Sequence, residues 1–337
     1  MTSSLVRVGI IGTGNIGADH VDRVAHQVSG ARVEALFDVM TDRVSALADS
    51  VGARSLPSAR AVIEDDAVDA IIVASPAEFH AELSLFSIAA GKPVLCEKPL
   101  APTNDECQIV VDAELEKGRR FVSLGFMRRY DAAYRHLREH LDGDKIGIPL
   151  HLRCVHRNPD VPPTFTSEMS MTDAVIHEID CARWLLGEEI SSIRVISGKS
   201  TPDAPHGLRD PQLVIMESTS GVLVSVEIFV AAQFGYDVRC EVSGSRGFSS
   251  MGYQDLGDYV TVAGRHSAFS PNWRVRFGEA YRLEIQDWVN GLAVGEIRGA
   301  NAFDGLAATT VAQAGVQAVR TGDIVPVHLP TRPSLYD

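Results

Sequence analysis

Hydrophobic and polar residues follow two different periods in the first 126 residues. Short apolar runs are separated by segments in which apolar residues recur every three or four positions. The runs are VRVGII (6–11), ARVEALF (31–37), DAIIVAS (69–75), KPVLC (92–96) and RFVSLGF (120–126). Short apolar strands that alternate with amphipathic helices predict a parallel, doubly wound sheet. We therefore expect an α/β fold with an N-terminal Rossmann domain at 1–126.

Beyond residue 150 the pattern changes to β-rich runs that are separated by turn residues. The runs lie at 150–157, 192–199, 212–219, 221–231 and 236–247. They predict a mostly antiparallel open sheet with one face covered and one face available for oligomerisation. Amphipathic helices are expected at 277–292 and 303–321, the second with Gly322 as its C-cap. Residues 127–337 are therefore assigned to a second α/β domain.

Composition narrows the possible partners. The chain of 337 residues is 45% hydrophobic and carries a formal net charge of −13, which argues against nucleic acid or an anionic membrane as partner. Its five cysteines are scattered, without C-x-x-C, as expected for reduced thiols in the cytoplasm. The N-terminus lacks the pattern of a signal peptide, and no run approaches 18 apolar residues. We expect a cytoplasmic protein that binds neither nucleic acid nor membranes.

Three glycines follow the first predicted strand in the spacing G-x-G-x-x-G. They are Gly12, Gly14 and Gly17, with Asn15 and Ile16 between the last two. This pattern, between a strand and a helix, allows a tight turn and a diphosphate at the helix N-terminus. Asp38 ends the next strand, where a carboxylate accepts hydrogen bonds from the adenosine ribose. No Lys or Arg follows it immediately, so NAD is favoured over NADP.

Two further segments end predicted strands and are expected to meet the cofactor. SPAEFH contributes Ser75, Pro76 and His80, and CEKP contributes Glu97 and Lys98. Ligands of such sheets bind beyond the carboxyl ends of the strands. A lysine there can stabilise an alkoxide that develops on a substrate; the alternative is a surface lysine in a turn. Pro99 is a candidate cis-proline, which the sequence does not decide.

The stretch MTDAVIHEIDCARWLLG (171–187) is predicted to form a helix with one unusual face. Asp173, His177 and Asp180 are spaced i, i+4, i+7, which places them on one stripe of an α-helix. Imidazole titrates near neutrality and can act as a general base, with a neighbouring acid holding its ring. The alternative is a local helix pair of small energetic value. Zinc is not expected, because Cys181 stands where H-E-x-x-H needs its second histidine.

These motifs together resemble the Gfo/Idh/MocA oxidoreductases, over essentially the whole chain. The glycine turn, E-K-P and D-x-x-x-H carry the resemblance; GFMRRYD (125–131), HRNP (156–159) and DAVIHEID (173–180) make it most similar to the inositol dehydrogenases. The resemblance implies Lys98, Asp173 and His177 as catalytic residues. It implies a substrate-binding and oligomerisation domain whose sheet forms a homotetramer. The implied substrate-binding residues are Arg128, His156, Asn158, Asp173, His177, Asp180, Tyr236 and Tyr281.

The expected reaction is the NAD-dependent oxidation of a secondary hydroxyl of myo-inositol, or a close cyclitol, to the inosose. A substrate such as scyllo-inositol or an aldose keeps the same chemistry, and a non-catalytic NAD-binding regulator is a further alternative. For Arg128 the alternative role is an interdomain salt bridge, and for Tyr236 and Tyr281 it is packing. The proline-rich segment 158–171 is a candidate lid over the sugar.

Overall fold

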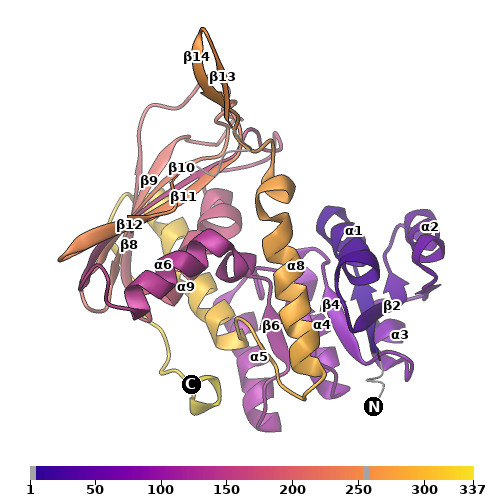
Figure 1. Ribbon diagram of the computed structural model, residues 1–337. Coiled ribbons are helices and arrows are strands. Elements are labelled where there is room, and N and C mark those ends of the chain that lie inside the picture. The colour runs from indigo at the N-terminus through magenta and orange to yellow at the C-terminus, as the bar shows by residue number, and fades with distance from the viewer. Residues whose placement is uncertain (1–4, 253–257) are drawn as a thin grey trace. The chain divides into compact units, whose positions relative to one another are not determined.

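The computed structural model describes residues 5–252 and 258–337, which divide into two compact units (Figure 1). Unit 1 comprises Met1–Met127, Tyr281–Thr309 and Pro330–Asp337, and unit 2 comprises Arg128–Ala280 and Thr310–Leu329. The sequence-based division assigned all residues after 126 to the second domain. In the structure two of these C-terminal segments pack with the nucleotide-binding fold instead. Local periodicity indicates that a helix has an apolar face but does not identify the core that buries it.

Unit 1 is built on a parallel sheet with the strand order β3-β2-β1-β4-β5-β6. The strands are β1 (Val6–Ile11), β2 (Ala31–Phe37), β3 (Arg54–Ser55), β4 (Ala70–Val73), β5 (Val94–Cys96) and β6 (Val122–Leu124). This is the order of a dinucleotide-binding Rossmann fold. The prediction of a doubly wound parallel sheet is confirmed.

Helices cover both faces of this sheet. They are α1 (Asn15–Asp22), α2 (Thr41–Val51), α3 (Ala59–Glu64), α4 (His80–Ala89), α5 (Asn104–Lys117) and the C-terminal part of α8 (Trp273–Leu292). Val8 and Ile10 of β1 face one core, which includes residues of α1 and α2 and also Ile285, Trp288 and Val289 of α8. On the other face, α4 lies between α3 and α5. The buried apolar side of α8 is therefore part of the nucleotide-binding unit.

Unit 2 contains a seven-stranded sheet with the order β12-β11-β7-β10-β9-β8-β15. Its strands are β7 (Pro149–Arg157), β8 (Ile190–Ser197), β9 (Gln212–Ser218), β10 (Leu223–Phe229), β11 (Asp237–Gly244), β12 (Gly247–Ser250) and β15 (Val325–Pro326). β7 and β10 pair in parallel, and the other neighbours pair antiparallel. A separate hairpin, β13 (Asp258–Thr261) and β14 (Gly264–Ser267), projects beyond this sheet (Figure 1). The expectation of a mostly antiparallel sheet is confirmed.

One face of this sheet is covered and the other carries exposed apolar side chains. Val214, Val224 and Val226 are fully buried on the covered face. The same strands expose Leu213 and Leu223, and β8 exposes Ile196, on the opposite face. The period of two along each strand produces this division.

Unit 2 contains α6 (Ala132–Asp142), α7 (Ile176–Leu186), the N-terminal part of α8 and the C-terminal part of α9 (Ala302–Thr321). A Cβ on Gly315 of α9 would lie 3.1 Å from Ile193 of β8, so glycine permits a close approach of helix and sheet. Gly322 has a φ of +77° directly after α9, as expected for a C-cap. No helix in the described part of the chain is long and apolar enough to span a membrane.

Candidate active site

The glycine turn between β1 and α1 leaves space at one residue and excludes side chains at the other two. Gly12 has a φ of +89°, and a Cβ there would lie 2.6 Å from the carbonyl oxygen of Ala74. A Cβ on Gly17 would collide with the carbonyl oxygen of Gly12. At Gly14, by contrast, a Cβ would meet no atom within 4 Å, and no side chain caps α1. The exposed amides of α1 and this open space fit a diphosphate at the helix N-terminus.

Asp38 lies beside this turn, at the end of β2, and its carboxylate is already held by four donors. Oδ2 accepts from Thr13 N (2.6 Å), Thr13 Oγ1 (2.9 Å) and Arg43 Nη2 (2.9 Å), and Oδ1 accepts from Met40 N (2.9 Å). Burial opposes ionisation, but these hydrogen bonds lower the pKa of Asp38 to about 2. The carboxylate is therefore ionised near neutral pH. The residues immediately after Asp38 include no Lys or Arg, but Arg43 on α2 places a positive charge beside the carboxylate.

Glu97 of the E-K-P motif is anchored by a histidine of α1. Nε2 of His20 lies 2.8 Å from Oε1 of Glu97, and Nη1 of Arg23 lies 3.2 Å from Nδ1 of His20. Because a guanidinium can only donate, Nδ1 accepts and Nε2 carries the proton that is donated to Glu97. Oε2 of Glu97 accepts the backbone N–H of Lys98 at 3.2 Å. This chain of contacts fixes the main chain at Lys98, whose side chain is half-buried.

His80 joins the other two strand-end segments. At the start of α4 its Nε2 lies 2.8 Å from the carbonyl oxygen of Ser75, and its Nδ1 lies 2.7 Å from that of Pro99. The Lys98–Pro99 peptide bond is cis. His80 is 1% exposed, whereas Ser75 is half-buried and Pro76 is exposed. His80 was expected to meet the cofactor together with these two segments. In the structure both of its ring nitrogens contact backbone carbonyl groups of the segments.

The second group of predicted residues lies on the helix that ends in α7, in unit 2. Residues Ser170–Val175 form a π-helical segment before α7 (Ile176–Leu186). The expected uniform α-helical spacing of Asp173 and His177 is therefore wrong, because Asp173 lies within the π segment and His177 lies within α7. Asp173 is exposed, whereas His177 and Asp180 are 8% and 1% exposed. π turns inside helices frequently occur at functional sites.

Two consecutive arginines bind two acids of α7. Arg129 donates to Asp180 through Nε (3.0 Å to Oδ2) and Nη2 (2.5 Å to Oδ1). Arg128 donates to Glu178, and its Nη2 lies 3.2 Å from Nδ1 of His156. Burial favours a neutral acid at Glu178, but the charge of Arg128 keeps its pKa below the usual value. The pair therefore stays ionised in the core of unit 2.

Glu178 is a residue that the sequence analysis missed. It is 0% exposed, and Arg128 is 1% exposed. The available signal was its position, because Val175, Glu178 and Ala182 are spaced i, i+3, i+7 on the apolar side of the helix. A carboxylate on such a face needs a charged partner. In the structure Arg128 and His156 contact this carboxylate.

Asn158 and Tyr236 are also in unit 2. Asn158 follows β7, and its backbone is bound to Phe229 and Ala232. Its buried Oδ1 has no hydrogen-bond partner within the described part of the chain, as expected of an acceptor that meets a ligand. Tyr236 is buried edge-on to His156, with ring centroids 6.1 Å apart.

Tyr281 belongs to unit 1 and is separate from that set. The guanidinium of Arg23 lies 4.7 Å from the centre of its ring, and the ring of His20 packs against its edge at 5.9 Å. Tyr281 therefore supports the residues that hold Glu97. The structure thus brings the predicted residues together in two groups, one at the strand ends of unit 1 and one around α7.

The segment 158–171, a candidate lid, is attached to its surroundings. Phe165 is 4% exposed. Oγ of Ser167 accepts the backbone N–H of Arg209 at 2.7 Å. Glu168 forms an ion pair with Arg320 at 2.7 Å. These contacts hold the second half of the segment in place.

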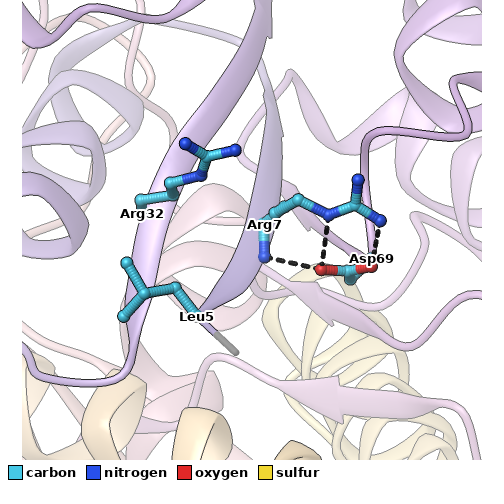
Figure 2. Close-up of a pocket in the computed structure, with 4 residues that line it drawn as sticks. All are labelled: Leu5, Arg7, Arg32 and Asp69. Carbon is cyan, nitrogen blue, oxygen red and sulfur yellow. Dashed lines mark hydrogen bonds and ion pairs between the residues drawn. The ribbon is translucent and has the colours of Figure 1, made fainter. Parts of the chain in front are cut away.

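Unit 1 contains a hollow of about 400 Å³ (Figure 2). Leu5, Arg7, Arg32 and Asp69 line it, at the amino ends of β1, β2 and β4. Arg7 donates to both carboxylate oxygens of Asp69 (Figure 2). The glycine turn and Asp38 are at the opposite, carboxyl ends of these strands, where α/β sheets bind ligands.

Within residues 5–252 and 258–337, no group of three His, Cys, Asp or Glu is arranged to hold a metal ion.

Two models of one protein family match this chain. Residues 6–126 match the GFO_IDH_MocA family, described as an oxidoreductase family with an NAD-binding Rossmann fold. Residues 134–249 match the GFO/IDH/MocA C-terminal domain. Inositol 2-dehydrogenase 3 of Saccharopolyspora erythraea is 45% identical over 331 residues, which are 98% of each chain.

Solved structures of inositol dehydrogenases are similar to this chain over nearly its full length. Myo-inositol dehydrogenase from Lactobacillus casei, in complex with NAD(H) and myo-inositol, superposes with a TM-score of 0.96 at 34% identity. The match covers 99% of this chain and 100% of that one. Apo scyllo-inositol dehydrogenase from the same organism has a TM-score of 0.89 at 26% identity, over 97% and 99% of the two chains.

Proposed function

The chain belongs to the Gfo/Idh/MocA family of NAD-binding oxidoreductases, and we propose that its substrate is myo-inositol. It is an NAD-dependent dehydrogenase that acts on a CH–OH group. The proposed reaction oxidises one secondary hydroxyl of the cyclitol to the inosose. The observation that carries this proposal is the full-length likeness to a myo-inositol dehydrogenase, at a TM-score of 0.96.

The residues of unit 1 fit the cofactor. The open space at Gly14 and the uncapped start of α1 would receive the diphosphate, and Asp38 would receive the adenosine ribose. Asn15, Ile16, Ser75 and Pro76 would line the same edge. When bound, NAD⁺ supplies the acceptor for the hydride that leaves the alcohol carbon. Asp38, ionised and close to the ribose position, would disfavour a 2′-phosphate.

We propose that residues around α7 remove the proton of the reacting hydroxyl. His177 would accept the proton of the reacting hydroxyl as general base, and Asp173 would orient its ring. The Lys98 ammonium would donate a hydrogen bond to the same oxygen and stabilise the charge that develops there. Asp180 and Asn158 would bind neighbouring hydroxyls; the unpartnered Oδ1 of Asn158 supports this role. Tyr236, Tyr281, Arg128 and His156 would shape and support these positions.

A second candidate substrate is scyllo-inositol, which the likeness to a scyllo-inositol dehydrogenase favours. The two cyclitols differ in the configuration of one carbon, so the same lysine, aspartate and histidine serve both. The choice between them is made by the groups that receive the neighbouring hydroxyls.

The test is NADH formation by the purified chain with NAD⁺ and, in turn, myo-inositol, scyllo-inositol, D-chiro-inositol, glucose and xylose. We expect the highest kcat/KM with myo-inositol and a turnover that is lower by about 10² or more in His177→Ala. A preference for scyllo-inositol or an aldose would overturn the substrate and keep the chemistry. Tight NADH binding without activity on any of the five would overturn the dehydrogenase and favour the regulator.

We also propose that the chain works as a homotetramer in the cytoplasm. The exposed face of the seven-stranded sheet, with Ile196, Leu213 and Leu223, supports self-association. The buried free cysteines support a reducing compartment. Light scattering coupled to gel filtration measures the assembly directly, and Leu223→Lys is expected to reduce the mass of the particle.

A further inference from the structure

We propose that His80 is a positively charged imidazolium that positions Lys98 by tying the chain after β5 to the chain after β4. This inference rests on the function proposed for Lys98. It replaces the expected role of His80 as a cofactor ligand with a role in positioning.

The contacts of His80 determine its protonation. Each ring nitrogen lies within hydrogen-bond distance of a backbone carbonyl oxygen, 2.8 Å at Ser75 and 2.7 Å at Pro99. A carbonyl oxygen can only accept, so both nitrogens must carry a hydrogen for both bonds to form. A neutral imidazole has only one such hydrogen and would leave a lone pair facing a carbonyl oxygen. The doubly protonated ring satisfies both contacts.

The surroundings of the ring are consistent with this charge. His80 is 1% exposed, and burial by itself lowers its pKa. Electrostatic and hydrogen-bond interactions with the Cys96 side chain on β5, together with the two carbonyl acceptors, outweigh burial and raise the pKa of His80 to about 9. The ring is therefore charged at neutral pH without contact with solvent.

The consequence for Lys98 follows from the groups on either side of it. Its N–H is bound to Glu97 Oε2, and the carbonyl of the next residue, Pro99, accepts from His80. Glu97 is in turn held by His20 of α1. The Lys98 main chain is thus held on one side from the helix after β1 and on the other from the helix after β4. A displacement of ~1 Å at a catalytic group can reduce turnover about 10²-fold.

The kinetic test is His80→Gln, with His136→Gln as the control. Glutamine has N–H donors on one nitrogen only, and its oxygen would face the second carbonyl. His136 is a histidine on the surface of α6, 62% exposed. We expect His80→Gln to lower kcat by about 10-fold to 100-fold, with the NADH dissociation constant unchanged and His136→Gln normal. Normal turnover in His80→Gln overturns the proposal, as does weakened NADH binding with unchanged kcat.

The protonation test needs no variant and no activity. Neutron diffraction from deuterium-exchanged crystals of the wild-type protein, grown near neutral pH, locates the deuterons on His80. Deuterons on both Nδ1 and Nε2 support the proposal, and a bare nitrogen overturns it even if His80→Gln fails to fold. Lack of activity of the wild-type protein on every polyol would count against the proposed function only, because the neutron result remains decisive for His80.

Discussion

Arg129 donates to both carboxylate oxygens of Asp180, at 3.0 Å and 2.5 Å, where the acid is almost fully buried. This geometry fixes the direction of the carboxylate that is proposed to receive a substrate hydroxyl. We expect Arg129→Ala to raise KM for myo-inositol about tenfold or more, the cost of about one charge-assisted hydrogen bond. Titration with NADH should give an unchanged dissociation constant. An unchanged KM would show that Asp180 does not depend on Arg129 for its position.

Lys98 and His177 are proposed to act on one oxygen atom, the lysine as hydrogen-bond donor and the histidine as base. We expect Lys98→Met and His177→Ala each to reduce turnover by about 10² or more. NADH binding, measured by fluorescence, should remain near normal in both variants, because neither change touches the glycine turn. Near-normal turnover in both would contradict the roles assigned to them.

Asp38 and Arg43 are expected to have opposite effects on cofactor choice. Asp38→Ser removes the charge that repels a 2′-phosphate and should raise kcat/KM for NADP⁺ relative to NAD⁺ by about tenfold or more. Arg43→Ala removes the cation 2.9 Å from Asp38 and should lower the same ratio. Steady-state kinetics with both cofactors measures it. A ratio that is unchanged in both variants would locate specificity elsewhere.

The α/β fold was predictable from the sequence because its longer strands have a local signal, whereas the two-residue β3 has none. Strand runs and helical segments alternate, and Gly12, Gly14 and Gly17 mark the first turn. The membership of the C-terminal part of α8 in unit 1 was not predictable, because the residues that bury Trp288 lie far away in sequence. The π segment before α7 also lacks a signal, since one wide turn hardly changes the spacing of the apolar residues.

The site was predictable where backbone geometry determines it and less so where ion pairs do. Asp38 and Lys98 follow strands, so their place at the sheet edge follows from the topology. The partners of Asp180 and Glu178 come from a segment some 50 residues earlier. Only the apolar neighbours of Glu178 on its helix indicate that a charged partner must exist.

The buried ion pair of Arg128 and Glu178 should matter for stability. Glu178→Leu leaves a buried guanidinium without its counter-charge and is expected to cost ~3–5 kcal/mol in the free energy of unfolding. Replacing both residues, as Arg128→Met with Glu178→Leu, should cost less than the single change. Glu64→Gln, which breaks an exposed pair with Arg60, is the control and should cost less than about 1 kcal/mol. Urea denaturation compares the wild-type protein with the three variants. A Glu178→Leu variant as stable as wild type would contradict this account.

The charge of His80 predicts how stability depends on pH. Its pKa rises from an ordinary 6.5 to about 9 on folding, so the folded protein binds the proton more tightly. The resulting stabilisation, ~3 kcal/mol, is complete below pH 6.5 and is lost as the pH rises through about 9. The wild-type free energy of unfolding should therefore fall over this interval, and His80→Gln should fall less steeply. Parallel curves for the two proteins would contradict the assignment.

The chain crosses from one unit to the other after residues 127, 280, 309 and 329. The nucleotide-binding unit is consequently not encoded by one contiguous part of the gene. A fragment that ends at residue 126 would lack Trp288 and Val289, which belong to the same hydrophobic core as Val8 and Ile10. Such a fragment is expected to aggregate when expressed alone, and a chimera with another dehydrogenase would need to exchange α8 together with the N-terminal half.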